Sequence, residues 1–150
     1  MENVKKKHVR LGQALETFRL AIRDFKNIDT FGVKEEEYQD RLYIALRNSV
    51  VKSFEYCIDL SWKYVKGFLE KVEKSIIEQN TPRYIFRKAF EANIFEKTEI
   101  ELSLEMLDSR NQTSHIYKEE VAEFIVQKTP AYYNLMMSIS RKMNPSSVKA

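Results

Sequence analysis

The chain has 150 residues and a nearly balanced charge, with 25 Lys and Arg against 22 Asp and Glu and a net charge of +3. Hydrophobic residues make up 43% and charged residues 31%, which is typical of a globular protein and excludes a disordered one. The length predicts one domain, residues 1–150, large enough to bury a core. The small positive charge permits contact with nucleic acid without indicating it.

Turn-forming residues and cysteine are scarce. Three Gly and three Pro are too few for the turns between many short strands, so we predict an all-α fold. The single cysteine, Cys57, excludes an internal disulfide and is typical of a reducing cytoplasm. No apolar run reaches the ~20 residues of a membrane-spanning helix, and no apolar stretch follows the basic residues 1–8 as in a signal peptide. We expect a cytoplasmic protein without membrane contact.

Apolar spacing predicts two long helices in the first half of the chain. The first covers about residues 6–27. A connection at 29–32 leads to a second helix from about 35 to 74, whose two adjacent apolar stripes predict contacts on several sides. At ~1.5 Å per residue this helix would be roughly 60 Å long, so we expect it to bend, to project or to enter a dimer interface, and we favour the interface.

Thr81 and Pro82 predict the start of a third helix, as a capping side chain followed by a proline at the first helical position. Its predicted buried face consists of Ile85, Phe86, Ala89, Phe90 and Ile94.

A fourth helix is predicted over about residues 98–111 and a further one from about Val121. We expect this last helix to stop before Pro130 and to resume at Tyr132, and residues 144–150 to fray. The predicted fold is an up-and-down, four-helix-type bundle with an extra C-terminal helix and a core over about residues 8–142.

Several motifs for nucleotide and metal chemistry are absent. The glycines are isolated, so there is no phosphate-binding loop. One Cys and two distant His cannot supply the four ligands of a zinc site, and we expect no metal and no cofactor. A nucleotidyltransferase should show a Gly-Ser pair followed by clustered aspartates. The chain has no Gly-Ser, so it is not itself predicted to be that enzyme.

Residues 106–117 (MLDSRNQTSHIY) concentrate the groups that suit chemistry. Arg110 precedes His115 by five residues, a spacing that arises by chance in about one such chain in eight and is a weak signal alone. In a structural interpretation, Arg110 closes a helix C-terminus, Asn111 terminates that helix, Ser114 caps the next one and His115 lies exposed.

A functional interpretation of the same residues assigns them to phosphate and ribose. His115 would act as general base or acid on a ribose 2′-hydroxyl. Arg110 would clamp the phosphate, and Asn111 would orient either group. This chemistry needs no metal, and a two-fold dimer would bring two copies of the motif together.

Three separated blocks carry a likeness to a known family: residues 54–63 (FEYCIDLSWK), 81–90 (TPRYIFRKAF) and 106–115 (MLDSRNQTSH). They resemble the HEPN family in the branch described as nucleotidyltransferase substrate-binding proteins, and the likeness covers roughly residues 10–140. The family's mark is an Arg-polar-x-x-x-His motif, met here by Arg110, Asn111 and His115, with Tyr117 following.

The resemblance implies a HEPN-like helical domain that forms a homodimer and acts with a separately encoded minimal nucleotidyltransferase. In toxin–antitoxin members of the wider family the HEPN protein is a metal-independent endoribonuclease, which implies Arg110 and His115 as catalytic residues. In some members the transferase adenylylates the motif tyrosine, here Tyr117. The expected nucleotide- or RNA-binding residues are Arg110, Asn111, Ser114, His115 and Tyr117.

Three functional hypotheses therefore stand side by side. The first is a HEPN partner of the transferase that binds nucleotide or RNA, with a role as toxin–antitoxin ribonuclease left open. The others are a non-catalytic substrate-binding subunit of the transferase and a structural helical dimer. Trp62 is interpreted as a core or dimer contact, with base stacking as the alternative. Cys57 is interpreted as a small buried hydrophobe. Arg83 and Arg87 are either solvated charges or a basic rim for phosphate. Residues 5–8 are interpreted as a solvated N-terminus.

Overall fold

Helices make up the whole fold of residues 1–147, the part of the chain that the computed structural model describes, and no strand occurs within it. The five α-helices are α1 (Glu2–Lys26), α2 (Glu36–Lys71), α3 (Pro82–Glu91), α4 (Lys97–Gln112) and α5 (Glu119–Lys142). Three 3-10 turns accompany them: η1 (Ile28–Phe31), η2 (Thr113–His115) and η3 (Pro145–Ser147). The predicted all-α bundle is confirmed.

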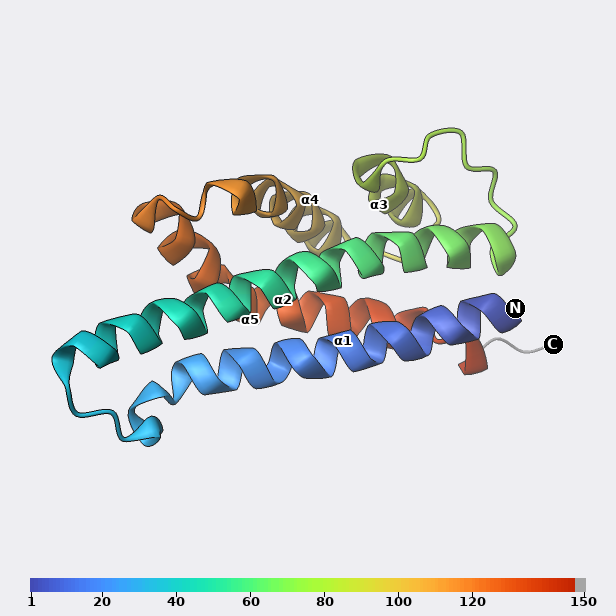
Figure 1. The fold of residues 1–150 in the computed structure, drawn as a ribbon. Helices are drawn as coiled ribbons and strands as arrows, with labels where there is room; N and C mark the ends of the chain where they lie inside the picture. The colour runs from blue at the N-terminus through green and yellow to red at the C-terminus, as the bar shows by residue number, and fades with distance from the viewer. Residues whose placement is uncertain (148–150) are drawn as a thin grey trace.

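The long helix α2 is the centre of the bundle. Its 36 residues correspond to about 54 Å, and α1 lies beside it over most of that length, while α3 and α4 lie on the opposite side. Helix α5 begins next to α4 and crosses α2 to run beside α1 (Figure 1). Phe54 of α2 is fully buried. Its ring centroid lies 6.3 Å from that of Phe18 on α1 and 5.2 Å from that of Tyr132 on α5. Val50 and Cys57 of the other apolar stripe are fully buried as well, so both stripes of α2 face neighbouring helices within the same chain.

Helix α5 is continuous through Pro130, so the predicted break at this residue is wrong. A proline lacks the N–H that would donate to the carbonyl of Val126. The hydroxyl of Thr129 donates to that carbonyl instead, at 2.7 Å. Burial of Ile125 on one side of the proline and of Tyr132 on the other holds both halves against the core. This C-terminal helix is thus part of the central packing.

The first residues of the chain and residues 145–147 are more ordered than the sequence predicts. Helix α1 begins at Glu2, and the Nε2 atom of His8 lies 3.0 Å from the carbonyl oxygen of Ser140, so His8 is not part of a solvated tail. Pro145 is buried within η3, so fraying does not begin at residue 144. The last predicted frayed residues, 148–150, lie outside the described residues.

Helix α3 begins as expected, but its buried face is narrower than predicted. The hydroxyl of Thr81 accepts a hydrogen bond from the Tyr84 N–H at 3.4 Å, and Pro82 occupies the first turn. Ile85, Phe86 and Ala89 are buried, but Phe90 is 41% exposed, so its assignment to the buried face is wrong. The reason is geometric, because α3 is only 10 residues long and packs on α2 and α4 through one narrow face.

None of the helices meets the requirement for crossing a bilayer. Within residues 1–147, no helix combines the necessary length with sufficient apolar character.

Candidate functional site

The α4–α5 corner, residues 110–117, carries the predicted site. Helix α4 continues past Asn111 to Gln112, and the N-cap of α5 is Lys118 without a side-chain cap bond. The predicted terminating role of Asn111 and the predicted capping role of Ser114 are therefore wrong. The C-cap of α4 is Thr113 instead, whose backbone N–H and hydroxyl both donate to the Arg110 carbonyl, the hydroxyl at 2.8 Å. Asn111 and Ser114 are exposed.

The last turn of α4 is fixed to the core directly beside Arg110. Ser109 is 3% exposed, and its hydroxyl lies 2.7 Å from the hydroxyl of Tyr132 on α5. Burial raises the pKa of Tyr132 to about 12, so its hydroxyl keeps its proton at neutral pH and can donate to Glu105 Oε1, 3.3 Å away. The backbone that carries Arg110 is thus held between α4 and α5.

The guanidinium of Arg110 is engaged by carboxylates of α2. Its Nε and Nη2 atoms donate to the two carboxylate oxygens of Asp59, each at 3.2 Å, and its Nη1 atom lies 3.3 Å from Glu55 Oε2. Nη1 also donates to the Thr113 hydroxyl at 3.0 Å. The hydrogen bond to Asp59 raises the pKa of Arg110. A phosphate bound here would compete with two carboxylates for one cation.

His115 and Tyr117 form a second pair, on the surface of the corner. The Nδ1 atom of His115 lies 3.4 Å from the Tyr117 hydroxyl, and the rings meet edge to face with centroids 5.9 Å apart. Tyr117 is 76% exposed. Across residues 1–147 no hydrogen bond or ion pair joins His115 to Arg110. The structure therefore divides the predicted site into an anchored cation and an exposed imidazole–phenol pair.

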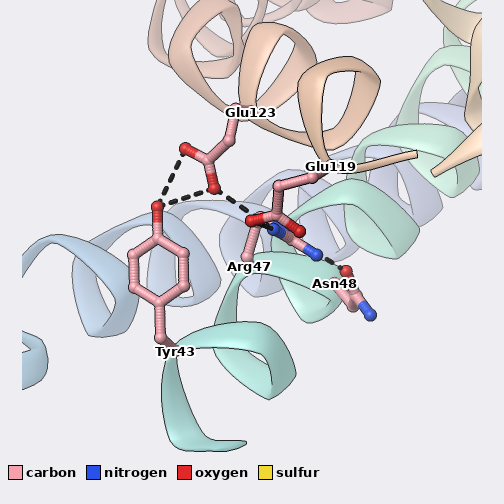
Figure 2. A network of polar contacts seen from close by, with 5 residues as sticks. All are labelled: Tyr43, Arg47, Asn48, Glu119 and Glu123. Carbon is pink, nitrogen blue, oxygen red and sulfur yellow. Dashed lines mark hydrogen bonds and ion pairs between the residues drawn. The ribbon is translucent and has the colours of Figure 1, made fainter. Parts of the chain in front are cut away.

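A buried arginine that the sequence analysis did not single out fixes the start of α5 (Figure 2). Arg47 is 3% exposed, and its Nη1 atom donates to Glu119 at 2.6 Å and to Glu123 at 3.2 Å. The Tyr43 hydroxyl donates to both oxygens of Glu123, at 2.7 and 2.8 Å. This network holds α5 two residues after Tyr117. The sequence signals for this network were an arginine directly after Leu46, a residue of an apolar stripe, and two glutamates four residues apart near the start of the last helix.

A groove of about 410 Å³ lies beside the corner, between α4 and the first turns of α5. Its apolar wall includes Val121 and Phe124, of which Phe124 is 56% exposed. Its acidic residues are Glu105, Asp108 and Glu120. The corner thus borders an apolar groove with a negative rim, which does not attract phosphate.

The remaining candidate residues take ordinary structural positions. Cys57 is buried, and burial raises the pKa of its thiol to about 12, which makes it an inert hydrophobe. Arg83 pairs with Asp108 at 2.8 Å, and Arg87 is exposed. Among the residues that the structure describes, no three potential metal ligands gather into one group.

The comparisons with known proteins define the class. A family model described as nucleotidyltransferase substrate binding protein like matches residues 11–145. The chain therefore belongs to this family. Among solved structures, a crystal structure of a protein from Thermus thermophilus has a TM-score of 0.64 at 24% identity, over 85% of this chain and 98% of the other. That likeness shows a shared fold. Comparison with curated protein sequences gave no match.

Proposed function

We propose that the chain is the HEPN-like partner of a separately encoded minimal nucleotidyltransferase in the cytoplasm, and that its α4–α5 corner contacts a nucleotide or RNA. The family name supports the link to a nucleotidyltransferase. The observation that carries the choice of site is the exposed His115–Tyr117 pair beside an arginine held by Asp59 and Thr113. In this proposal the whole chain acts as one HEPN-like domain.

The corner residues divide their proposed roles according to exposure. Arg110 is a fixed cation that orients the ligand, since its guanidinium is anchored on three sides. His115 is exposed and can donate to or accept from a phosphate or ribose hydroxyl. Asn111 and Ser114 add exposed hydrogen-bonding groups.

Tyr117 is the proposed acceptor of an adenylyl group, because it is the most exposed aromatic group of the corner. Its hydroxyl oxygen would attack the α-phosphorus of ATP in the transferase, pyrophosphate would leave, and the phenolic proton would pass to a base. His115, with Nδ1 at 3.4 Å, is placed to take part in that proton transfer.

The test is co-expression with the transferase encoded beside this chain, followed by co-purification and measurement of intact mass. We expect a stable complex and an adenylyl mass increase that is absent in Tyr117→Phe. Tyr38→Phe is the matched control, because Tyr38 is also an exposed tyrosine, 50%, at the start of α2. Failure of the two proteins to co-purify would overturn the proposed partnership. An unchanged mass with an active transferase would overturn the role of Tyr117.

A metal-independent endoribonuclease is the second candidate, favoured by the exposed imidazole five residues after a fixed arginine. His115 would remove the 2′-hydroxyl proton, and O2′ would attack the adjacent phosphorus while Arg110 stabilises the charge. The bond from phosphorus to the 5′-oxygen would break, the 5′-oxygen would take the proton from the His115 imidazolium, and a 2′,3′-cyclic phosphate would remain. RNA cleavage and growth inhibition should then fall in His115→Ala and Arg110→Lys. Equal cleavage by the wild type and both folded variants would exclude this activity.

A homodimer is part of the same proposal. The exposed Phe124 and the apolar groove beside the corner supply a face on which a second copy can pack. Sedimentation equilibrium of the wild type should give a dimer, and Phe124→Ser should shift the equilibrium toward the monomer. A monomeric wild type at high concentration would remove this part of the proposal.

A further inference from the structure

A second hollow of the surface lies between the N-terminal half of α1 and the C-terminal half of α2. It is a groove of about 390 Å³, within the size range of small-ligand sites. We call it the basic groove, because four of its lining residues are cations: Lys7, Arg10, Lys63 and Lys66. Trp62 and Asn80 also line it, and Glu70 is its single acidic member.

The four cations of the basic groove differ from Arg110 in that they have no ion-pair partner within residues 1–147. Over residues 1–147, none of them takes part in an ion pair or in a hydrogen bond through its side chain. An anion entering the groove would therefore displace no carboxylate. At the corner, by contrast, Arg110 already donates to Asp59. The groove is thus the stronger attractor of phosphate on electrostatic grounds.

Two aromatic residues line the groove, and of these Tyr64 is buried while Trp62 is accessible enough to add selectivity for a base. Trp62 is the single tryptophan of the chain and is partly buried, and the Lys63 Nζ atom lies 5.9 Å from its ring centroid. An aromatic ring beside cations is the combination that binds single-stranded nucleic acid, through stacking of the base and pairing of the phosphate. The amide of Asn80 offers both a donor and an acceptor for a base edge or a ribose. Stacking favours a nucleotide over an acidic protein surface.

We infer that the basic groove binds a nucleoside phosphate, either as a free nucleotide or as one unit of a single-stranded RNA. This inference rests on the proposed function in so far as the ligand is the same at both sites. The groove supplies affinity, and the corner supplies the chemistry or the contact with the transferase.

The two sites are connected along α2. Glu55, Asp59, Trp62 and Lys66 follow one another at spacings of four, three and four residues, which places them on one face of the helix. Asp59 reaches the corner through Arg110, whereas Trp62 and Lys66 line the groove. The rise from Asp59 to Lys66 is about 10 Å. A short single strand anchored in the groove can therefore extend toward the corner.

The test measures binding of AMP and of a short oligoadenylate to the full chain. Each ligand is titrated while the fluorescence of Trp62 is recorded, and labelled oligoadenylate is followed by anisotropy for the variants. The wild type should show saturable quenching of Trp62. A free-nucleotide site gives similar affinities for the two ligands, whereas an RNA site gives much tighter binding of the oligoadenylate.

The decisive variant is Lys63→Glu with Lys66→Glu, and its matched control is Lys26→Glu with Lys34→Glu. Both pairs change the net charge equally, but Lys26 and Lys34 are exposed residues outside the basic groove. We expect at least roughly tenfold weaker binding in the groove variant and little change in the control. Trp62→Phe, which keeps an aromatic ring, should bind more tightly than Trp62→Ala, by roughly tenfold.

Equal losses in both charge variants would show non-specific attraction and overturn the inference. Full affinity in the groove variant would also overturn the inference. So would a wild type that binds no nucleotide, combined with a groove variant that has lost only its binding to the transferase. The adenylyl mass test on Tyr117 separates this outcome from failure of the proposed function, because it does not depend on affinity in the groove.

Discussion

The α4–α5 corner and the basic groove both contain cations, but their cations are in opposite states. At the corner Arg110 is held by Asp59, Glu55 and Thr113. In the basic groove, Lys63 and Lys66 lie beside Trp62 without an acidic partner among the described residues. A paired cation orients a backbone and a site, while an unpaired one attracts an anion. The positions of arginines and lysines in the sequence therefore locate a phosphate site only after their partners are known.

The largest expected effect tests the structural role of a paired cation. The buried Arg47, which holds the start of α5 next to the corner, provides this test. Replacing it with Ala should lower the free energy of unfolding by about 3 kcal/mol, at the low end for a buried ion pair because Glu119 remains 67% exposed. Urea unfolding would measure the change. Arg41→Ala is the matched control, because its pair with Glu37 is exposed on both sides, and it should change stability by only about 0.3 kcal/mol. Similar losses in both variants would contradict a structural role for Arg47.

The binding half of the comparison predicts a steep dependence on salt. If all four cations of the basic groove contact phosphates, the affinity for oligoadenylate should fall roughly fiftyfold between about 50 and about 200 mM salt, from a slope of about −0.7 per contact. Anisotropy titrations over this range would measure the slope. A flat dependence would mean that the unpaired cations do not carry the affinity.

The anchoring of Arg110 can be weakened without removing the arginine. Thr113→Val should lower stability by about 1 kcal/mol, because Thr113 is buried and its hydroxyl both accepts from the Arg110 guanidinium and donates to the Arg110 carbonyl. Thr113→Ser keeps the hydroxyl and should lose less. Thermal unfolding of the two variants would rank them, and the reverse order would contradict the anchoring role.

The smallest expected effect concerns the floor of the basic groove. Gly67 lies inside α2 without a positive φ, and an added Cβ would lie 3.7 Å from the Lys7 Nζ atom, an ordinary contact. Gly67→Ala should therefore stabilise the helix by about 0.5–1 kcal/mol. A loss of stability on thermal unfolding would show that the groove floor is packed more tightly than this distance indicates.

Regular helical patterning made most of the fold predictable. The apolar stripes placed α1, α2 and α4 within a few residues, and Thr81 with Pro82 placed the start of α3. The predicted break at Pro130 was wrong because a neighbouring side chain replaces the missing backbone donor. A proline is expected to end a helix, but the Thr129 hydroxyl donates to the Val126 carbonyl in its place. The capping roles predicted for Asn111 and Ser114 were wrong, because Thr113, which lies between them, is the C-cap of α4 and donates to the Arg110 carbonyl.

The candidate site was only partly predictable. The sequence brought Arg110, His115 and Tyr117 together as neighbours along the chain, and the structure keeps His115 with Tyr117 while it turns Arg110 toward α2. The carboxylates that pair with Arg110 lie far from it in the sequence, and Asp59 is 51 residues away, so no local sequence pattern predicts them. The basic groove was not predicted for the same reason, because Lys7 and Lys63 become neighbours only when α1 packs on α2.

Nuclear magnetic resonance of the isotopically labelled chain during titration with oligoadenylate would test the division of labour between the two regions most directly. The single indole N–H of Trp62 reports on the basic groove, and the imidazole of His115, one of two histidines, reports on the corner. The Trp62 signal should shift first, at the lowest ligand concentrations, and the His115 signal should follow only with a strand long enough to extend along α2. A shift of His115 with an unmoved Trp62 would contradict the proposal that the unpaired cations of the groove hold the phosphate.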